Sequence, residues 1–274
     1  MTIRKLEVIS VRSLATDVFE YCLADPAGAE LGPFEPGAHV HVAVPSGGTR
    51  QYSLTGDPSE RRHLTIAVKR EADGRGGSRS FIEQTRIGDL VEVSAPQNDF
   101  PLAEGGGRVI LIAGGIGITP IYAMAHALAQ SGRDFHLYYL SRSPAHTAYA
   151  EEIAAAPFSA RVTLHHDGGD PERAFDLSSV LEPAEKTTVY CCGPTPLLRA
   201  VRELTREWPA GAVRFEDFGT DAPAVEEGGE RAFRVRFDGS SESYLVPPGQ
   251  SILSVLQEAG LDVPSSCEAG TCGT

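Results

Sequence analysis

Hydrophobic and polar residues alternate in short runs over the first hundred positions. The runs have the pattern or the β-branched composition of strands, and Gly, Pro and Asp separate them. The six runs are Val8–Val11, Phe19–Leu23, His39–Val44, Gln51–Leu54, Leu64–Val68 and Leu90–Val93. Because no long helical pattern interrupts them, we predict an all-β, six-stranded antiparallel barrel with a short helical turn over 80–85.

The pattern changes at Arg108. From there to Gly219, apolar strand patterns alternate with amphipathic helical patterns, which favours an α/β domain with a doubly wound parallel sheet. The predicted strands are 109–113, 135–140, 161–165, 187–191 and 213–216, and the predicted helices are 120–130, 147–155, 177–182 and 196–206. Ligands of such sheets bind beyond the carboxyl ends of the strands.

The end of the chain has a third character. A segment rich in Ala, Pro, Gly and acidic residues precedes a hairpin pattern over 233–246 and a helical pattern over 252–259. These changes predict four parts, namely a barrel at 1–103, an α/β domain at 104–220, a linker at 221–231 and a last domain at 232–274.

Composition excludes some classes of partner. The 274 residues include 24 Lys plus Arg against 37 Asp plus Glu, and this formal net charge of −13 disfavours nucleic acid and anionic membranes. There is no run of about 18 apolar residues and no signal-peptide pattern. The five cysteines do not resemble a disulfide framework. We therefore expect a cytoplasmic protein with neither nucleic acid nor membrane as partner.

Two glycine-bearing turns follow strands at the same edge of the predicted sheet. In the first, Gly114-Gly115-Ile116-Gly117-Ile118-Thr119-Pro120, we expect Thr119 to cap the next helix and Pro120 to take its first position. The second, Cys192-Gly193-Pro194, repeats the arrangement, and Cys192 is expected at the mouth of the cleft between the turns. Glycines let a ligand approach the backbone, and helix N-termini bind anions. Taken alone, an ordinary strand-to-helix turn also explains the first turn.

Two segments of the predicted barrel are suited to a phosphorylated aromatic ligand. The run from Arg50 to Leu54 offers a guanidinium beside the Tyr52 ring. The run from Gly74 to Arg79 offers backbone N–H groups, a hydroxyl and two cations at the start of a helix. A surface Arg beside a half-buried Tyr, and a flexible hairpin loop, are the alternative interpretations. His39 and His41 are expected on a solvent-facing strand edge and not in a metal site.

The spacing of Cys267 and Cys272 fits the opening of a plant-type iron–sulfur loop, C-x4-C-x2-C. Two thiolates are half of the ligands of a [2Fe-2S] cluster, so we expect the cluster only if the chain continues beyond Thr274. A fragment of a longer protein is our expectation, and a truncated form and a chance pair of cysteines are the alternatives.

Taken together and in this order, these segments resemble the phthalate dioxygenase reductase family, flavin reductases that supply electrons to Rieske oxygenases or heme-thiolate monooxygenases. The resemblance covers nearly the whole chain. It implies a ferredoxin reductase-like fold, in which a flavin-binding barrel and a nucleotide domain precede a partial β-grasp ferredoxin domain. It also implies FMN and not FAD, a [2Fe-2S] cluster, and NADH as electron donor, with NADPH possible. The partner it implies is a terminal oxygenase.

The resemblance further implies roles for individual residues. Ser53 and Thr119 would orient the flavin ring, and Cys192 would line the nicotinamide position. Phe218 would cover the flavin face where the nicotinamide enters, and Glu216 would lie near it. The other implied cofactor-binding residues are Arg50, Gln51, Tyr52, Leu54, Ala67, Val68, Lys69, Gly76, Gly77, Ser78, Gly114, Gly115, Gly117, Ile118, Pro120, Ser141, Arg142, Gly193 and Pro194. The implied iron ligands are Cys267 and Cys272.

Redox chemistry connects these cofactors. A nicotinamide gives up two electrons as a hydride, whereas an iron–sulfur cluster takes electrons singly, so a flavin must stand between them. We therefore expect an NAD(P)H-dependent flavin oxidoreductase, the monomeric reductase component of an oxygenase. The alternatives are an FAD-containing ferredoxin or flavodoxin reductase without a cluster, and a non-enzymatic flavin redox sensor or relay subunit. Arg142 would suit the 2′-phosphate of NADPH, whereas the resemblance favours NADH.

Overall fold

The computed structural model describes residues 2–72, 76–182, 186–218, 232–237, 242–248, 250–261 and 263. The chain forms two compact units, 1–218 and 219–274, which are described here one at a time. Within the described part of the chain, no helix combines the length and the apolar character needed to span a bilayer. The predicted linker, 221–231, and both predicted iron ligands, Cys267 and Cys272, lie outside the described residues.

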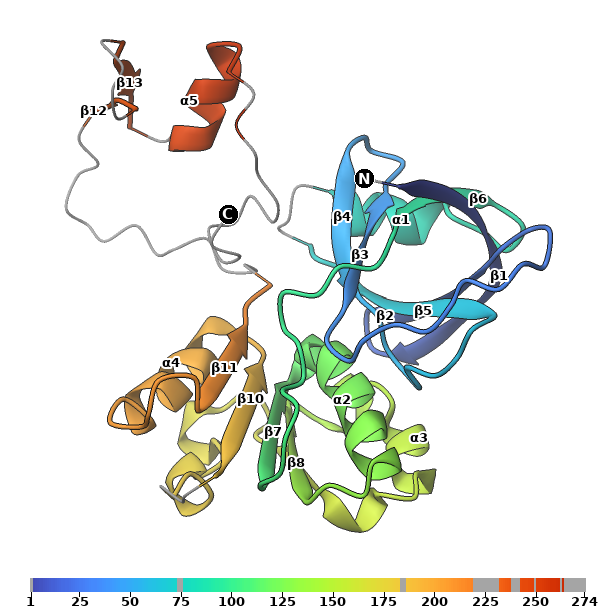
Figure 1. The fold of residues 1–274 in the computed structure, drawn as a ribbon, viewed down its shortest axis with the longest axis vertical. Coiled ribbons are helices and arrows are strands. Elements are labelled where there is room, and N and C mark those ends of the chain that lie inside the picture. Colours follow the sequence, from blue (N-terminus) through green and yellow to red (C-terminus); the bar gives the residue numbers. More distant parts are fainter. Residues whose placement is uncertain are drawn as a thin grey trace. The chain divides into compact units, whose positions relative to one another are not determined.

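The first unit begins with the predicted six-stranded antiparallel sheet. Its strands are β1 (Ile3–Ala15), β2 (Val18–Ala24), β3 (His39–Ala43), β4 (Thr49–Ser53), β5 (His63–Lys69) and β6 (Leu90–Ser94). Their order in the sheet is β4-β3-β6-β1-β2-β5 (Figure 1). A bridge between Leu54 and Ile66 joins the two edges and closes the sheet into a barrel. Closure pairs edge strands that would otherwise present unpaired backbone groups.

One helix, α1 (Gly77–Gln84), covers an end of the barrel (Figure 1). Phe81, which is fully buried, packs edge-on against Tyr21 with the ring centroids 4.8 Å apart. The helical turn predicted over 80–85 is thus the second half of a longer helix. Its start follows Gly76, whose φ of 82° is a left-handed conformation that glycine adopts without strain.

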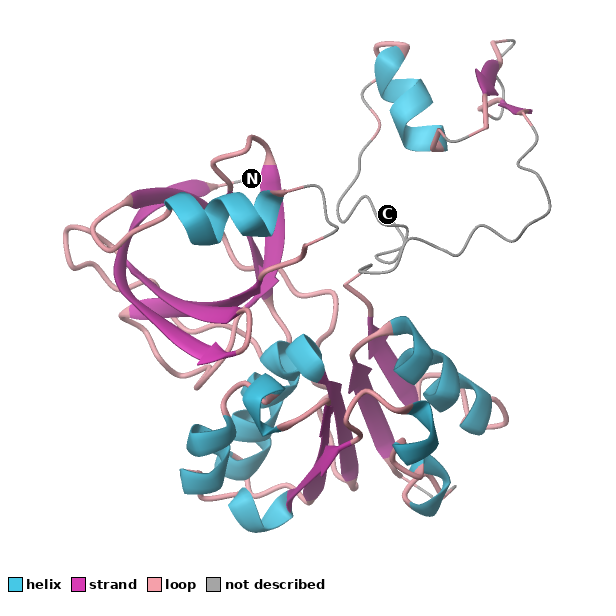
Figure 2. Cartoon of the chain, turned by 180° about the vertical axis from the view of Figure 1, so that it is seen from behind, coloured by secondary structure: helices cyan, strands magenta, loops and turns pink. Residues whose placement is uncertain are grey.

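The parallel five-stranded sheet is confirmed in the second part of this unit. Its strands are β7 (Val109–Gly114), β8 (Phe135–Ser141), β9 (Val162–His166), β10 (Thr188–Cys192) and β11 (Val213–Glu216), in the order β11-β10-β7-β8-β9. Helices α2 (Ile118–Gln130) and α3 (Ala150–Ala155) cover one face, and α4 (Thr195–Leu204) covers the other (Figure 2). The sheet is therefore doubly wound.

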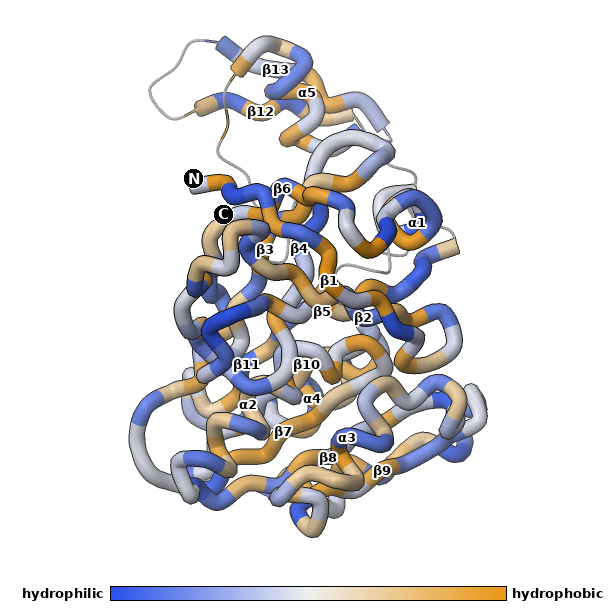
Figure 3. Tube along the Cα trace, turned by 90° about the vertical axis from the view of Figure 1, so that its right-hand side faces the viewer, coloured by the Kyte–Doolittle hydropathy of each residue, from blue (hydrophilic) through white to orange (hydrophobic). Residues whose placement is uncertain are grey.

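Burial on both faces explains the continuous apolar run of β7. Leu111 and Ala113 pack with α2 in one core cluster, whereas Ile110 and Ile112 pack with α4 in another. Every residue of β7 is buried, and the hydrophobic colouring of Figure 3 follows this strand. A strand covered on both sides needs no polar face, which is why its sequence does not alternate.

The start of α2 differs from the prediction. A 3-10 turn over Gly115–Gly117 runs directly into the helix, which begins at Ile118 with Gly117 as its N-cap. Thr119 is therefore not the cap, and Pro120 is not the first helical residue. The Thr119 hydroxyl instead donates a hydrogen bond to the Ile116 carbonyl oxygen at 3.1 Å.

Two other predicted helices are shorter than expected. The helix predicted over 147–155 begins only at Ala150, because Tyr149 before it has a left-handed φ of 61° and the Thr147 hydroxyl bonds back to the Ser143 carbonyl. The helix predicted over 177–182 is a single 3-10 turn, Leu177–Ser179, whose start Asp176 caps. The local hydrogen bond of Thr147 thus competes with helix formation in the first of these places.

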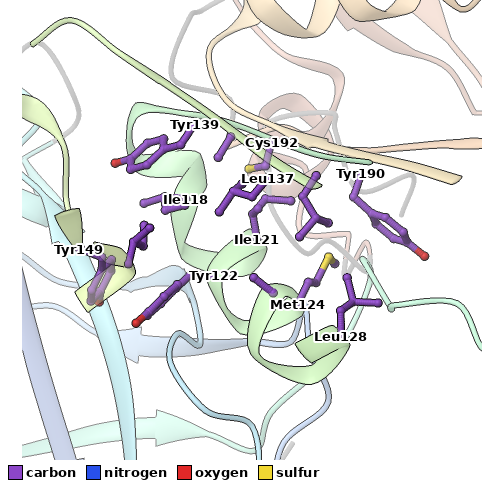
Figure 4. Packing of buried hydrophobic residues seen from close by; sticks show 14 of the residues in the cluster. Ile118, Ile121, Tyr122, Met124, Leu128, Leu137, Tyr139, Tyr149, Tyr190 and Cys192 are labelled. Atoms are coloured by element: carbon purple, nitrogen blue, oxygen red, sulfur yellow. The ribbon is translucent and has the colours of Figure 1, made fainter. Parts of the chain in front are cut away.

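The barrel and the parallel sheet share packed side chains. Val18 and Ala67 of the barrel belong to the core cluster built around α2, and Ala123 of α2 belongs to the barrel's own cluster. Figure 4 shows the α2 side of this packing, including Tyr122 and Tyr149. The two parts therefore form one compact unit with a packed seam between them. The domain boundaries predicted at 103, 220 and 231 stay a prediction.

The second unit contains a hairpin and a helix. Strands β12 (Phe233–Val235) and β13 (Tyr244–Val246) are antiparallel, and α5 (Ile252–Glu258) follows them. Ser251 caps this helix by accepting a hydrogen bond from the Ser254 N–H at 3.0 Å. Both elements agree with the patterns in the sequence.

Candidate functional site

The two glycine turns meet at the carboxyl edge of the parallel sheet. Because β7 and β10 are neighbours in the sheet, Gly114 and Gly193 leave it side by side. A Cβ on Gly193 would lie 2.9 Å from the Cα of Gly114, and a Cβ on Gly117 would lie 2.2 Å from the Cys192 carbonyl oxygen. These approaches require glycine. The two turns are thus packed against each other at the sheet edge.

Arg50 lies over the N-terminus of α1. A Cβ on Gly77 would stand 2.4 Å from the Arg50 Nε, so the guanidinium needs the glycine beneath it. The helix starts without a side-chain cap, which leaves its first N–H groups available. A guanidinium beside free N–H groups at a helix start is suited to a phosphate. Gly74 and Arg75 of the predicted loop lie outside the described residues, and Ser78 accepts a hydrogen bond from the Glu71 N–H.

Next to Arg50 on β4, two polar side chains lack hydrogen-bond partners. The Ser53 Oγ and the Tyr52 hydroxyl are both inaccessible to solvent, and neither forms a hydrogen bond within the described residues. Burial raises the pKa of Tyr52, so its hydroxyl keeps its proton. Buried polar atoms normally have partners. The Ser53 hydroxyl is thus free to bond to a polar atom of a ligand, and this group of residues fits a flavin.

The neighbouring strand β5 supplies the remaining barrel candidates. Ala67 and Val68 are buried, and Ala67 packs in the same core cluster as Ile118 and Cys192. Lys69 is exposed and forms an ion pair with Glu71 at 2.8 Å. The end of β5 therefore lies at the seam with the parallel sheet, where a ring bound to the barrel would face the nucleotide-binding edge.

The expectation that Cys192 stands at the mouth of the cleft is wrong for this structure. Its side chain has no exposed surface and belongs to the core cluster around α2. Burial raises the pKa of the Cys192 thiol well above its ordinary value, so the thiol is neutral. Phe218 packs against the same cluster and is half-buried. Any route to Cys192 therefore requires its neighbours to move.

Glu216, at the end of β11, has an unusual protonation state. Its Oε2 atom is inaccessible and has no hydrogen-bond partner in the described part of the chain. Burial, together with the negative charge of Asp99, raises the pKa of Glu216 to about 8. The carboxyl group is thus largely protonated at neutral pH. Nothing in the sequence pattern singles out Asp99, because its loop reaches Glu216 only in the folded chain.

His39 does not face solvent as predicted. It has no exposed surface, and neither of its ring nitrogens has a hydrogen-bond partner among the residues described. Burial lowers the pKa of His39, so the ring is neutral. His39 lies directly opposite Ser53 in the β3–β4 pairing. The alternating sequence of β3 predicts an exposed side chain at this position, but the closure of the barrel buries the His39 ring.

The end of β8 carries a polar network. The Ser141 and Thr147 hydroxyls are 2.7 Å apart, and the Thr147 hydroxyl is 3.0 Å from the Nε2 of His166. Arg142, next in the chain, is exposed. The sequence has no acidic residue directly after β8. Asp167 follows the adjacent strand β9, however, and its N–H donates a hydrogen bond to the Ser141 carbonyl oxygen at 3.3 Å. The strand order β8-β9 thus brings a carboxylate to this edge.

Three family models match successive parts of the chain. Residues 5–101 match the oxidoreductase FAD-binding domain, and residues 111–203 match the oxidoreductase NAD-binding domain. Residues 235–274 match the 2Fe-2S iron-sulfur cluster binding domain. The order of the three agrees with the order of the predicted parts.

Curated proteins resemble the chain over most of their length. A phthalate dioxygenase reductase from Burkholderia cepacia is 48% identical over 272 residues, which are 98% of this chain and 84% of that protein. A vanillate O-demethylase oxidoreductase from Pseudomonas putida is 40% identical over 270 residues, 97% of this chain and 84% of that protein. Their names describe the first as a reductase and the second as an oxidoreductase.

Solved structures agree with this similarity. The structure of a phthalate dioxygenase reductase matches with a TM-score of 0.83 at 48% identity and covers 99% of this chain and 84% of its own. An intact type IV self-sufficient cytochrome P450 monooxygenase matches with a TM-score of 0.82 at 33% identity, over 99% of this chain and 35% of its own.

Proposed function

The chain belongs to the phthalate dioxygenase reductase family, and on that basis we propose that it transfers electrons from NADH, through FMN and a [2Fe-2S] ferredoxin domain, to a partner oxygenase. The observation that supports this most is the Ser53 hydroxyl, which has no hydrogen-bond partner in the described part of the chain and lies on a barrel whose β5 shares a core with the glycine turns. When bound, FMN accepts two electrons as a hydride from NADH and releases them one at a time.

Barrel residues hold and orient the flavin in this proposal. Arg50 and the N–H groups at Gly76, Gly77 and Ser78 bind its phosphate, as the uncapped start of α1 supports. Ser53 donates a hydrogen bond to the ring, since it has no partner among the described residues. The remaining contacts come from Gln51 and Tyr52 of β4, from Leu54 directly after it, and from Ala67, Val68 and Lys69 of β5.

Residues of the parallel sheet bind the nucleotide and exclude water. The turns at Gly114–Pro120 and Cys192–Pro194 bind the pyrophosphate and nicotinamide parts, and Thr119 approaches the flavin from α2. Phe218 covers the nicotinamide position until NADH arrives, and its packing against the core cluster that contains Cys192 supports this. Glu216 holds a proton on its carboxyl group near this position, because burial disfavours its charged form.

We propose NADH as the donor on the basis of the edge formed by β8 and β9. Asp167 is beside Ser141, and a carboxylate there would bind a free 2′-hydroxyl and repel a 2′-phosphate. Arg142 is exposed and would favour the phosphate, so the two side chains have opposite effects. Measuring the rate of flavin reduction by NADH and by NADPH in Asp167→Asn and in Arg142→Ala separates the effects of the two side chains. The proposal predicts that Asp167→Asn loses the preference for NADH.

Extraction of the flavin tests the cofactor assignment. The mass of the flavin released from purified protein distinguishes FMN from the FAD of a ferredoxin or flavodoxin reductase. The visible spectrum of the same sample shows whether iron–sulfur absorbance accompanies the flavin bands, with Cys267 and Cys272 as proposed ligands from this chain. FAD in the extract would contradict the FMN assignment and leave the NADH site untouched.

The finer features of the protein are also proposals. We place it in the cytoplasm as a monomer that meets its oxygenase transiently, which suits its net charge of −13 and electron transfer by encounter. Sedimentation of the purified holoprotein tests the monomer. A flavin that NADH leaves oxidised would instead favour a redox sensor or relay subunit.

A further inference from the structure

A cavity lies in the seam between the barrel and the α2–α3 side of the parallel sheet. Its volume is about 260 Å³, and residues of both parts line it. None of its lining residues is among the proposed flavin or nicotinamide contacts. The cavity has room for several water molecules or for a small organic molecule. The redox site does not account for this space.

Three buried polar atoms at this cavity form no hydrogen bond of good geometry within the residues described, and the Tyr149 hydroxyl faces the Thr55 hydroxyl and the Glu20 carboxylate. They are the Tyr149 hydroxyl, the Thr55 hydroxyl and the Nε2 of His126. Tyr149 and Thr55 are each only 2% exposed. A buried polar atom without a partner is costly, and the cost is removed when a ligand supplies the partner. Three such atoms on one cavity point to a polar occupant.

The charge of the lining is negative. Glu20, Asp57, Glu60 and Glu152 line the cavity with Arg12, whose guanidinium pairs with Glu20 and Glu152. Burial lowers the pKa of His126, so this ring adds no charge at neutral pH. The carboxylates therefore outnumber the fixed cation, and a cationic ligand would be attracted.

Aromatic rings form part of the wall. Tyr122 and Tyr149 stack with their centroids 4.9 Å apart and their planes 20° from parallel. Figure 4 shows both rings on the α2–α3 side, where the barrel strands run alongside them. Tyrosine rings attract organic cations through their negative faces, and they pack against planar apolar groups. The wall thus combines aromatic surface with carboxylates.

We propose that this cavity binds a small planar organic cation, such as an amidinium or guanidinium compound, with its charge toward Asp57 and Glu60 and its apolar part against Tyr122 and Tyr149. The Thr55 and Tyr149 hydroxyls accept hydrogen bonds from the cation, which gives these buried atoms their missing partners. Because barrel and sheet residues both contact it, the ligand holds the two parts of the seam together.

Calorimetric titration of the holoprotein with benzamidine, benzamide and benzoate tests the proposal. The three probes have nearly the same shape, and their charges are positive, neutral and negative. Benzamidine is expected to bind at least about tenfold more tightly than benzamide, since hydrogen bonds to a charged group are the stronger ones, and benzoate is expected to bind least. Equal binding of all three, tighter binding of benzoate, or binding of none, as in a cavity that holds only water, overturns the proposal.

Variants locate the binding. The double variant Asp57→Asn with Glu60→Gln removes two charges but keeps oxygen atoms that can accept the backbone hydrogen bonds at Ser59 and Arg62. It is expected to weaken benzamidine binding about tenfold. The matched control, Glu203→Gln with Glu207→Gln, removes two exposed carboxylates that flank Arg206 on the α4 side and should leave binding unchanged.

A second, milder variant keeps the test valid if the double variant does not fold. Tyr149→Phe removes only a hydroxyl that forms no hydrogen bond of good geometry within the described part of the chain, so the fold should tolerate it. It is expected to weaken benzamidine binding several-fold and to leave the flavin spectrum unchanged. Benzamidine binding that neither the double variant nor Tyr149→Phe alters would contradict the placement of the ligand in this cavity.

Discussion

Gly114 and Gly193, which end neighbouring strands, meet backbone to backbone: a Cβ on Gly193 would stand 2.9 Å from the Cα and 3.0 Å from the nitrogen of Gly114. The same Cβ would stand 2.9 Å from a methyl carbon of Leu197 on α4. The second glycine turn therefore joins two strands and a helix, and it is also part of the proposed nucleotide site. Packing requires glycine here.

Replacing Gly193 with alanine should therefore reduce stability and NADH binding together. The added methyl has to push the Gly114 turn aside, and we expect a loss of about 1–3 kcal/mol in the free energy of unfolding, as for other overpacked sites. Thermal unfolding and NADH titration measure the two effects. The control is Gly106→Ala, because a Cβ there meets nothing within 4 Å. Wild-type stability and NADH affinity in Gly193→Ala would argue against this contact.

Arg50 gives a prediction about flavin retention. Arg50→Ala removes the guanidinium that lies over Gly77 at the start of α1, so the purified variant should hold much less flavin per chain. The ratio of flavin to protein absorbance measures this. Arg62→Ala, which removes an exposed arginine of the barrel, should keep the wild-type ratio. If Arg50→Ala keeps its full flavin content, the phosphate is bound elsewhere.

Replacing Ser53 with alanine should slow hydride transfer and leave the stability of the protein almost unchanged. Since its hydroxyl has no partner in the described part of the chain, Ser53→Ala should change the free energy of unfolding of the flavin-free protein by no more than about 0.5 kcal/mol. Hydride transfer should slow about tenfold or more, because the flavin ring loses a fixed donor. Denaturant unfolding and rapid-mixing kinetics measure the two quantities. A large loss of stability with unchanged kinetics would make Ser53 a structural residue only.

The buried carboxyl group of Glu216 should make the free energy of unfolding depend on pH. Burial raises the pKa of Glu216 from 4.5 to about 8 in the folded protein, so unfolding releases its proton between these values. The folded state thus loses stability as the pH rises through this range, by at most about 1.4 kcal/mol per pH unit. Glu216→Gln lacks this loss, and the difference in free energy of unfolding between variant and wild type should grow from pH 5 to about 8.

The comparison between variant and wild type matters because other groups titrate in the same range. Burial lowers the pKa of His39, so its contribution to stability rises with pH through the ordinary histidine range, opposite in sign to that of Glu216. His39 is present in both proteins, and its contribution cancels in the difference. A difference that stays constant from pH 5 to 8 would show that Glu216 is ionised in the folded protein.

Much of the fold followed from local patterns in the sequence. The unbroken apolar run of β7 predicted a strand buried on both faces, and its residues do alternate between the α2 and α4 clusters. The alternating strands before it predicted the barrel. These features depend on side-chain periodicity and turn residues, which the sequence displays directly.

The positions that sequence reasoning missed depend on long-range packing. The alternating pattern predicts that a histidine in this strand is exposed, but His39 is buried because the barrel closes around it. The position of Cys192 after a strand predicts a residue at the mouth of a cleft, but the core cluster around α2 encloses it. Asp167 reaches the β8 edge only because β9 is the next strand in the sheet. The cavity at Tyr149 and Thr55 exists only between the two packed parts, so no local motif could indicate it.

The most direct test of electron transfer across the seam is anaerobic rapid mixing of the holoprotein with NADH while the visible flavin absorbance is followed. The flavin is expected to bleach within a single turnover, and Ser53→Ala is expected to slow this bleaching while the same flavin remains bound. Flavin absorbance that persists in the wild-type protein with NADH in excess would contradict the account.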